Sequence, residues 1–172
     1  GMIDQVDSYF GQIMNKLEAL GEDLDDWIIV YTSDHGEMLG EHGIWEKTRF
    51  YEGSVRVPLI IRWPRPFQAH VVDDNVNLCD LFATLCDLAG LDIPEGLDSR
   101  SLLPLLHGET ANWNNETVSQ MGTTHVMIKQ DQLKYQYYGE EIPEVLFDLA
   151  NDPGETVNVA DSTDYSQATQ GF

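Results

Sequence analysis

The residues most able to do chemistry lie in one stretch, from Thr32 to Pro58. It contains the adjacent Asp34 and His35, and also Lys47, one of only four lysines in the chain. A carboxylate oxygen beside an imidazole nitrogen suits a divalent metal ion, from calcium through manganese to zinc. Near such a metal, Lys47 would supply a positive charge for an anionic substrate or a departing oxygen. On this interpretation, the residue types form a metal site that binds an anion.

The same residues also have a purely structural interpretation. Asp34 could accept hydrogen bonds from loop amides, and His35 could pack as a neutral side chain. The four glycines of the stretch would then only permit its turns, and Lys47 would be a solvated charge. Three further residues could either orient the metal ligands or serve the loop alone: Glu41, His42 and Arg56. Both interpretations stay open on residue types alone.

The segments on either side predict the elements that would position this stretch. Trp27 to Tyr31 is apolar and rich in β-branched and aromatic residues, which predicts a buried strand, and Leu59 to Trp63 predicts a second. Apolar residues spaced by three and four predict helices over Ile3 to Leu20 and Val76 to Leu88, and a short one over Ser101 to Leu106. A polar, glycine-rich loop directly after a buried strand is where open α/β sheets bind ligands. We therefore expect an α/β fold with the site at this loop.

The composition changes near residue 109, where Glu109 to Asn115 is polar. We expect a partial α/β domain over residues 1–108 and a small antiparallel-sheet subdomain over residues 109–172, with a frayed tail past Ala160. The turn Gln130-Asp131-Gln132 predicts a hairpin within the second part. Its expected strands are Glu116 to Gln120, Thr124 to Lys129, Leu133 to Tyr138 and Val145 to Asp148.

The charge of the chain excludes some classes of partner. It has 30 acidic against 9 basic side chains, a net charge of -21. A phosphate backbone or an acidic membrane surface would be repelled by such a protein, so we expect neither nucleic acid nor a membrane as partner. No apolar run approaches the roughly 20 residues of a membrane span, and no signal peptide is visible. Both the cytoplasm and the periplasm therefore stay open.

The two cysteines, Cys79 and Cys86, are seven residues apart in the expected second long helix. That spacing places them on one helix face about 10 Å apart, which is too far for a disulfide. We expect buried, inert thiols.

The stretch and several later segments resemble the type I sulfatases of the alkaline phosphatase superfamily, and most of all the branch with choline-sulfatase, iduronate-sulfatase and phosphonate monoester hydrolase. The similarity extends over nearly the whole chain, but only over the carboxy-terminal part of that family. The residues that resemble the second metal-binding segment of the family are Thr32 to Gly36, Leu39 to Lys47 and Val57 to Ile60. The residues that resemble its later helix, turn and small sheet are Leu81 to Gly90, Gly96 to Leu106, Lys134-Tyr135 and Leu146 to Glu155.

This resemblance implies the carboxy-terminal portion of an alkaline-phosphatase-like sheet with flanking helices, followed by the small antiparallel sheet. It also implies that Asp34 and His35 bind a divalent metal, usually calcium, and that Lys47 contacts the sulfate of a small sulfated substrate. Many members carry Asn where His35 stands, which leaves manganese or another divalent ion open. A phosphonate or phosphate monoester hydrolase of the same superfamily is the first rival, and a non-catalytic binding or assembly module is the second.

The resemblance further implies a formylglycine nucleophile, formed in a Cys-x-Pro-x-Arg or Ser-x-Pro-x-Arg segment of the amino-terminal half of such enzymes. Cys79 is followed by Asp-Leu-Phe-Ala and Cys86 by Asp-Leu-Ala-Gly, so neither matches that segment. We therefore expect a fragment that begins within a longer first helix and has no appreciable turnover alone. An apolar surface where the absent part would pack predicts self-association.

Overall fold

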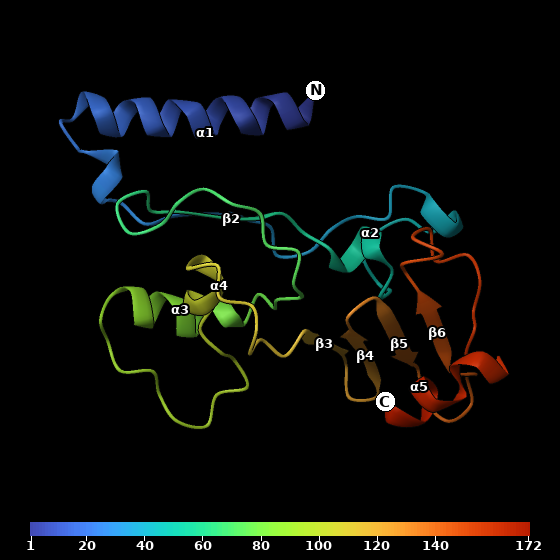
Figure 1. Cartoon of the computed structure of the whole chain (residues 1–172). Coiled ribbons are helices and arrows are strands. Elements are labelled where there is room, and N and C mark those ends of the chain that lie inside the picture. Colours follow the sequence, from blue (N-terminus) through green and yellow to red (C-terminus); the bar gives the residue numbers. More distant parts are fainter. The chain divides into compact units, whose positions relative to one another are not determined.

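The computed structural model describes residues 1–172, apart from the side chain of Gln170. The chain forms two compact units, which are described separately (Figure 1). The first comprises Gly1–Ser33 and Pro58–His70, and the second comprises Asp34–Val57 and Val71–Phe172. Among the described residues, no helix has both the length and the apolar character needed to cross a membrane. The chain combines helices with two β-sheets, as expected, whereas the boundary at residue 109 stays a prediction.

The first unit contains one long helix and a two-stranded sheet. Helix α1 spans Met2–Ala19, within one residue of the prediction at each end, and Gly21 ends it with a φ of 89°. A short 3-10 helix, η1 (Leu24–Asp26), leads into β1 (Ile29–Thr32). Strand β1 pairs antiparallel with β2 (Leu59–Arg62), so that Thr32 lies opposite Leu59. The residues on either side of the candidate site are therefore held next to each other by the sheet.

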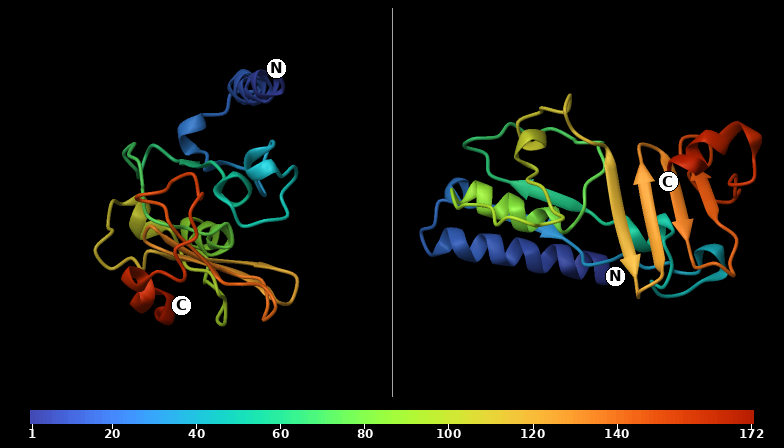
Figure 2. Two further views of the ribbon diagram at one scale, coloured as in Figure 1. Left: turned by 90° about the vertical axis from the view of Figure 1, so that its right-hand side faces the viewer. Right: turned by 90° about the horizontal axis from the view of Figure 1, so that it is seen from below.

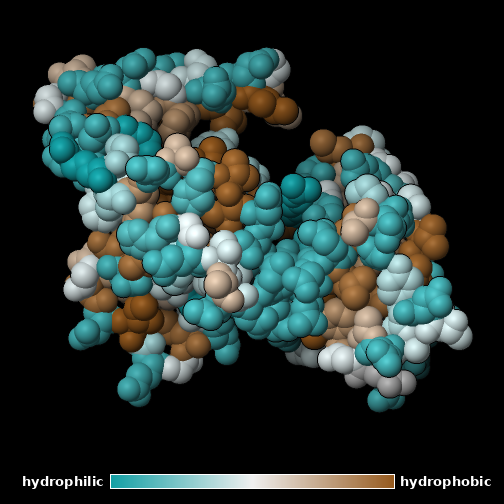
Figure 3. Space-filling model, in the orientation of Figure 1, coloured by the Kyte–Doolittle hydropathy of each residue, from teal (hydrophilic) through white to brown (hydrophobic). Residues whose placement is uncertain are grey.

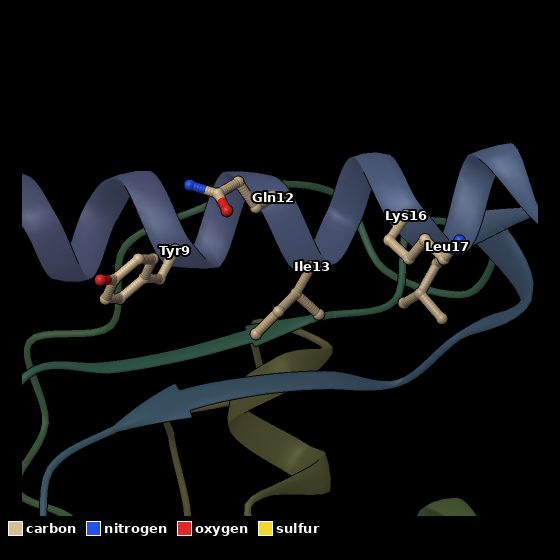
Figure 4. A pocket seen from close by; sticks show the side chains of 5 residues that line it. All are labelled: Tyr9, Gln12, Ile13, Lys16 and Leu17. Atoms are coloured by element: carbon tan, nitrogen blue, oxygen red, sulfur yellow. The ribbon is translucent and has the colours of Figure 1, made fainter.

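The elements of this unit are less buried than the sequence predicts. None of the 18 residues of α1, all of them described, is buried, and the residues of β1 and β2 are half-buried or exposed. Figure 3 shows apolar side chains on the surface of α1, where Ile3 is 87% exposed. Ile13 and Leu17 extend from the same side of α1 and help to line a surface hollow of about 410 Å³ (Figure 4). The expectation of buried strands is wrong here, because two strands cannot cover their own faces.

The second unit is organised by a four-stranded antiparallel sheet with the strand order β3-β4-β5-β6 (Figure 2). Each strand agrees with its prediction to within one residue at either end. In the hairpin between β4 and β5, Asp131 has a φ of 51°, as a tight turn requires. The sheet core includes Met127, Leu146 and Phe147. The strands are β3 (Glu116–Met121), β4 (His125–Gln130), β5 (Leu133–Tyr137) and β6 (Val145–Asp148).

The second unit also contains five short helical elements. They are η2 (Glu41–Gly43), α2 (Glu52–Val55), α4 (Leu103–Leu106), η3 (Thr163–Tyr165) and α5 (Ser166–Gly171).

Helix α3 (Asp80–Leu88) begins four residues later than predicted. The reason is local, because the residues before Asp80 form a turn with its own hydrogen bonds. The amide of Asn77 donates to a carboxylate oxygen of Asp80 at 2.9 Å, and the amide of Cys79 donates to the side-chain oxygen of Asn77 at 3.1 Å. Cys79 therefore lies at the helix start and is exposed, while Cys86 is half-buried, and both are free thiols. The expectation that both thiols are buried is wrong for Cys79. Partial desolvation, followed by the charge of Asp80, raises the pKa of the Cys79 thiol.

Candidate functional site

The loop after β1 begins with a close approach of two backbone segments. The amide of Gly36 donates a hydrogen bond to the carbonyl of Ser54 in α2 at 2.7 Å. A Cβ atom at Gly36 would lie only 2.1 Å from the carbonyl oxygen of Gly53. Only glycine fits at this position. The segment that contains Asp34 is thereby held against α2.

From there the chain forms a compact loop that returns to its starting point. The amide of Met38 donates to the carbonyl of Glu46 at 3.0 Å, and the amide of Glu46 donates to a carboxylate oxygen of Glu37 at 2.6 Å. Met38 is fully buried. Three residues other than glycine adopt a positive φ, which allows the tight reversal: Leu39, His42 and Glu46. Because the loop closes on itself, Lys47 comes back beside His35.

The three residues singled out in the sequence lie together. Nε2 of His35 is 3.3 Å from a carboxylate oxygen of Asp34 and 2.5 Å from Nζ of Lys47. The backbone amide of His35 donates to the other carboxylate oxygen of Asp34 at 3.0 Å. The side chain of Asp34 is 83% exposed, and that of His35 is 37% exposed. A carboxylate, an imidazole and an amine therefore converge at a place that a ligand can reach.

The charges of this group favour an ionised Asp34. Desolvation raises the pKa of this carboxyl, but His35, hydrogen bonds from the amides of Asp34 and His35, and the charge of Lys47 together outweigh it. The pKa of Asp34 is accordingly below its ordinary value of 3.8. At neutral pH the group offers a carboxylate, as a cation ligand must.

The geometry of His35 also fits a metal ligand. Its Nδ1 lies 2.8 Å from the carbonyl oxygen of Gly36, so a proton on Nδ1 is donated to this carbonyl and Nε2 keeps its lone pair. Nε2 and the neighbouring oxygen of Asp34 can then face one cation. Among the described residues there is no group of three or more His, Cys, Asp or Glu side chains that could hold a metal ion. Two donors thus fit a divalent metal, but they make only part of a site.

We expect the chain to bind calcium or manganese weakly, because two ligands leave most of the coordination positions of either ion to water. Titration calorimetry with each chloride salt should show a small, unsaturated signal that disappears in the Asp34→Ala variant. Glu109→Gln removes one exposed charge elsewhere and serves as the control. Tight binding of one ion per chain would contradict the assignment of a partial site.

The other loop residues considered in the sequence have structural surroundings. The His42 ring stacks on Tyr51, with 4.0 Å between the ring centroids and 11° between the planes. A carboxylate oxygen of Glu41 lies near Gly53, 3.1 Å from the position that a Cβ there would take. Arg56 is the residue directly after α2, where its charge helps to lower the pKa of Glu52. Their contacts support the structural interpretation for these three residues.

A buried ionic cluster beneath α2 was missed by the sequence reasoning. Nζ of Lys134 on β5 lies 2.8 Å from a carboxylate oxygen of Glu52 and 2.8 Å from one of Glu155. The Glu52 contact is a hydrogen bond, while the Glu155 contact has ion-pair distance without hydrogen-bond geometry. The other oxygen of Glu155 accepts from the amide of Glu52 at 2.6 Å. Lys134 is completely buried. The only hint in the sequence is that this lysine lies within an expected strand, Leu133 to Tyr138.

This cluster makes stability depend on pH. Burial raises the pKa of Glu52, but the charge of Lys134 and the hydrogen bond from it outweigh burial, so the folded pKa is below the ordinary 4.5. A depressed carboxyl pKa contributes stability above the unfolded pKa, and this stability is lost as the pH falls through the folded pKa.

We therefore expect the free energy of unfolding, from urea titrations between pH 7 and 3, to fall below about pH 4.5 more steeply in the unsubstituted chain than in Glu52→Gln. Glu109→Gln, whose carboxyl is exposed, should follow the unsubstituted chain. Parallel curves for all three proteins would refute the role of Glu52.

The chain also resembles proteins whose functions are known. A family model described as "N-sulphoglucosamine sulphohydrolase, C-terminal" matches residues 40–172. The N-acetylglucosamine-6-O-sulfatase of Bacteroides thetaiotaomicron is 33% identical over 175 residues, which covers 94% of this chain and 31% of that protein. The choline-sulfatase of Rhizobium meliloti is 37% identical over 166 residues, or 93% of this chain and 32% of that protein. The chain thus spans about a third of the length of these relatives.

Solved structures give the same match. The phosphonate monoester hydrolase of Agrobacterium radiobacter superposes with a TM-score of 0.88 and 34% identity, over 99% of this chain and 38% of that one. The putative sulfatase yidJ of Bacteroides fragilis gives a TM-score of 0.87 and 28% identity, over 99% and 38% of the two chains.

Proposed function

Because this chain belongs to the sulfatase family, as one of its carboxy-terminal domains, we propose that it supplies part of a centre that hydrolyses sulfate esters. Asp34 and His35 would be ligands of the divalent metal, and Lys47 would bind the ester. The observation that carries this proposal is the convergence of the three side chains, with 3.3 Å between Asp34 and His35 and 2.5 Å between His35 and Lys47.

Each side chain has a definite task in such a centre. The Asp34 carboxylate and Nε2 of His35 would hold the metal. The family resemblance implies calcium, and the imidazole nitrogen also suits manganese or another divalent ion. The metal would neutralise the negative charge of the sulfate oxygens. With Nε2 engaged by the metal, the amine of Lys47 would lose its present hydrogen-bond acceptor and could donate to the ester. There it would stabilise the charge that develops on the departing oxygen.

The nucleophile would come from outside these 172 residues. Sulfatases generally depend on a metal and a formylglycine, and neither Cys79 nor Cys86 has the Pro and Arg that follow the cysteine modified to formylglycine. Cys79 directly precedes α3, and Cys86 lies within that helix. We therefore propose that the chain has no turnover by itself.

A chimera tests the proposed activity. The part of the Rhizobium meliloti choline-sulfatase that precedes the matched region would be joined to this chain and produced together with a formylglycine-generating enzyme. Release of sulfate from choline sulfate or an aryl sulfate is the expected result, whereas the chain alone should release none. A folded chimera that releases no anion from any ester would instead favour a non-catalytic binding or assembly module.

A phosphonate or phosphate monoester hydrolase is the second candidate. It is favoured by the similarity to the phosphonate monoester hydrolase of Agrobacterium radiobacter. An aryl sulfate and a phenylphosphonate monoester, assayed on the same chimera, distinguish the two. A higher kcat/KM for the sulfate ester is expected, and a higher value for the phosphonate ester would replace the first proposal with the second.

A further inference from the structure

Ser54 forms hydrogen bonds to both segments that carry the proposed ligands. Its carbonyl oxygen accepts from the amide of Gly36, directly after His35, at 2.7 Å. Its hydroxyl donates to the carbonyl of Lys47, also at 2.7 Å. Ser54 is only 3% exposed, so water does not compete strongly for these bonds. A single buried residue therefore joins the start of the loop to its end.

The helix that carries Ser54 depends on the sheet for its position. Helix α2 has four residues, far fewer than the roughly 12 that an isolated helix needs for stability. Its first residue, Glu52, is bonded through its carboxylate to Lys134 and through its amide to Glu155. Lys134 and Glu155 are 0% and 4% exposed. This buried cluster fixes α2, and α2 in turn fixes Ser54.

A second contact holds the segment between Lys47 and α2. Phe50, which is 4% exposed, packs on the Tyr138 ring with 5.7 Å between centroids. Tyr138 in turn donates its hydroxyl to Gln136 on β5 at 2.8 Å. Lys134 and Gln136 share one face of β5, and Tyr138 follows directly after this strand. This face supports the segment on both sides of Tyr51.

Fixing the backbone of Lys47 matters because its side chain is long. The amine of a lysine can occupy many positions because its side chain is flexible. Fixing the backbone from which the side chain extends reduces the number of these positions. The amine here lies 2.5 Å from Nε2 of His35, and the Nδ1 of that ring lies 2.8 Å from the carbonyl oxygen of Gly36. A misplacement of about 1 Å in a catalytic group can cost about 100-fold in rate.

We propose that Ser54 is a positioning residue that sets the separation between Lys47 and the Asp34–His35 pair. The Lys134–Glu52–Glu155 cluster holds Ser54 in its place. The meaning of this separation for turnover rests on the proposed function, but the separation itself is a property of this chain.

Proton NMR of the 172-residue chain tests the proposal without any assay of activity. In the unsubstituted chain, a nuclear Overhauser effect is expected between the His35 ring and the Lys47 methylene next to Nζ. It should be lost in Ser54→Ala, which removes the hydroxyl, and retained in Ser54→Thr, which keeps it. Ser101→Ala is the matched control, because it removes a serine hydroxyl that donates to Asp87 at 2.6 Å, outside the loop.

Three results would overturn the proposal: no such effect in the unsubstituted chain, an undiminished effect in Ser54→Ala, or an equal loss in Ser101→Ala. Unchanged amide resonances of β3 to β6 show that each variant is folded. An inactive chimera combined with the expected NMR pattern would count against the proposed function and not against the role of Ser54.

Discussion

Replacing Lys134 by methionine is expected to lower the free energy of unfolding by about 3–5 kcal/mol, because removal of one partner leaves buried charge without compensation. Lys134 is 0% exposed and lies between the carboxylates of Glu52 and Glu155. Methionine has similar length, so little packing is lost and the effect comes from the charge. Urea unfolding followed by far-ultraviolet circular dichroism measures the change.

Lys129 provides the matched control for this substitution. It lies directly opposite Lys134 in the register of β4 and β5 and is half-buried. Desolvation is the main cause that lowers the pKa of Lys129. The charge of Glu52 opposes this shift, and the charge of Lys134 adds to it. Lys129→Met removes a repulsion between neighbouring like charges and should leave stability unchanged or slightly higher. Equal losses for the two lysines, or a loss below about 1 kcal/mol for Lys134→Met, would mean that the cluster does not hold the fold.

Replacing Gly36 by alanine is expected to cost about 3 kcal/mol, since the new methyl group would stand 2.1 Å from the carbonyl oxygen of Gly53. Backbone atoms cannot rotate away as a side chain can, so α2 and the Asp34 segment must separate. The same substitution should weaken the contact between His35 and Lys47. Thermal unfolding and the NMR contact described above report the two effects.

Alanine substitutions at two other glycines provide reference values for this loss of stability. A Cβ at Gly53 would meet side-chain atoms of Glu41 and Met38 at 3.1 and 3.3 Å, and these can move, so Gly53→Ala should cost about 1 kcal/mol. Gly11 is within α1 with nothing inside 4 Å, so Gly11→Ala should cost nothing and raise helix stability slightly. A Gly36→Ala variant as stable as the unsubstituted chain would contradict the close approach of Gly36 to the Gly53 carbonyl.

Local patterns in the sequence predict the elements of this fold well. The spacing of Val6, Phe10, Ile13 and Leu17 is sufficient to predict α1. The strand-like segments on either side of the turn at Asp131 are sufficient to predict the hairpin of β4 and β5. The predicted start of α3 is four residues too early, because apolar spacing does not reveal that Asn77 to Cys79 form a turn before the helix begins at Asp80.

The sequence was sufficient to predict which residues form the candidate site, but not which residues hold them in place. Residue types alone pointed to Asp34, His35 and Lys47, and the family resemblance gave each a role. The structure places Lys47 beside the other two. The cluster of Lys134, Glu52 and Glu155 joins residues up to 103 positions apart, and periodicity carries no information on pairs at such separation. Burial of a lysine also opposes the general tendency of this residue to be solvated, so no composition rule predicts it.

The rate of sulfate release by the chimera that carries Lys47→Ala tests the central claim most directly. Loss of one cationic group that stabilises the departing oxygen should lower kcat about 100- to 1,000-fold. Lys129→Met in the same chimera should leave the rate unchanged. A folded Lys47→Ala chimera that releases sulfate at the rate of the unsubstituted one would contradict the assignment of this loop as part of a sulfatase centre.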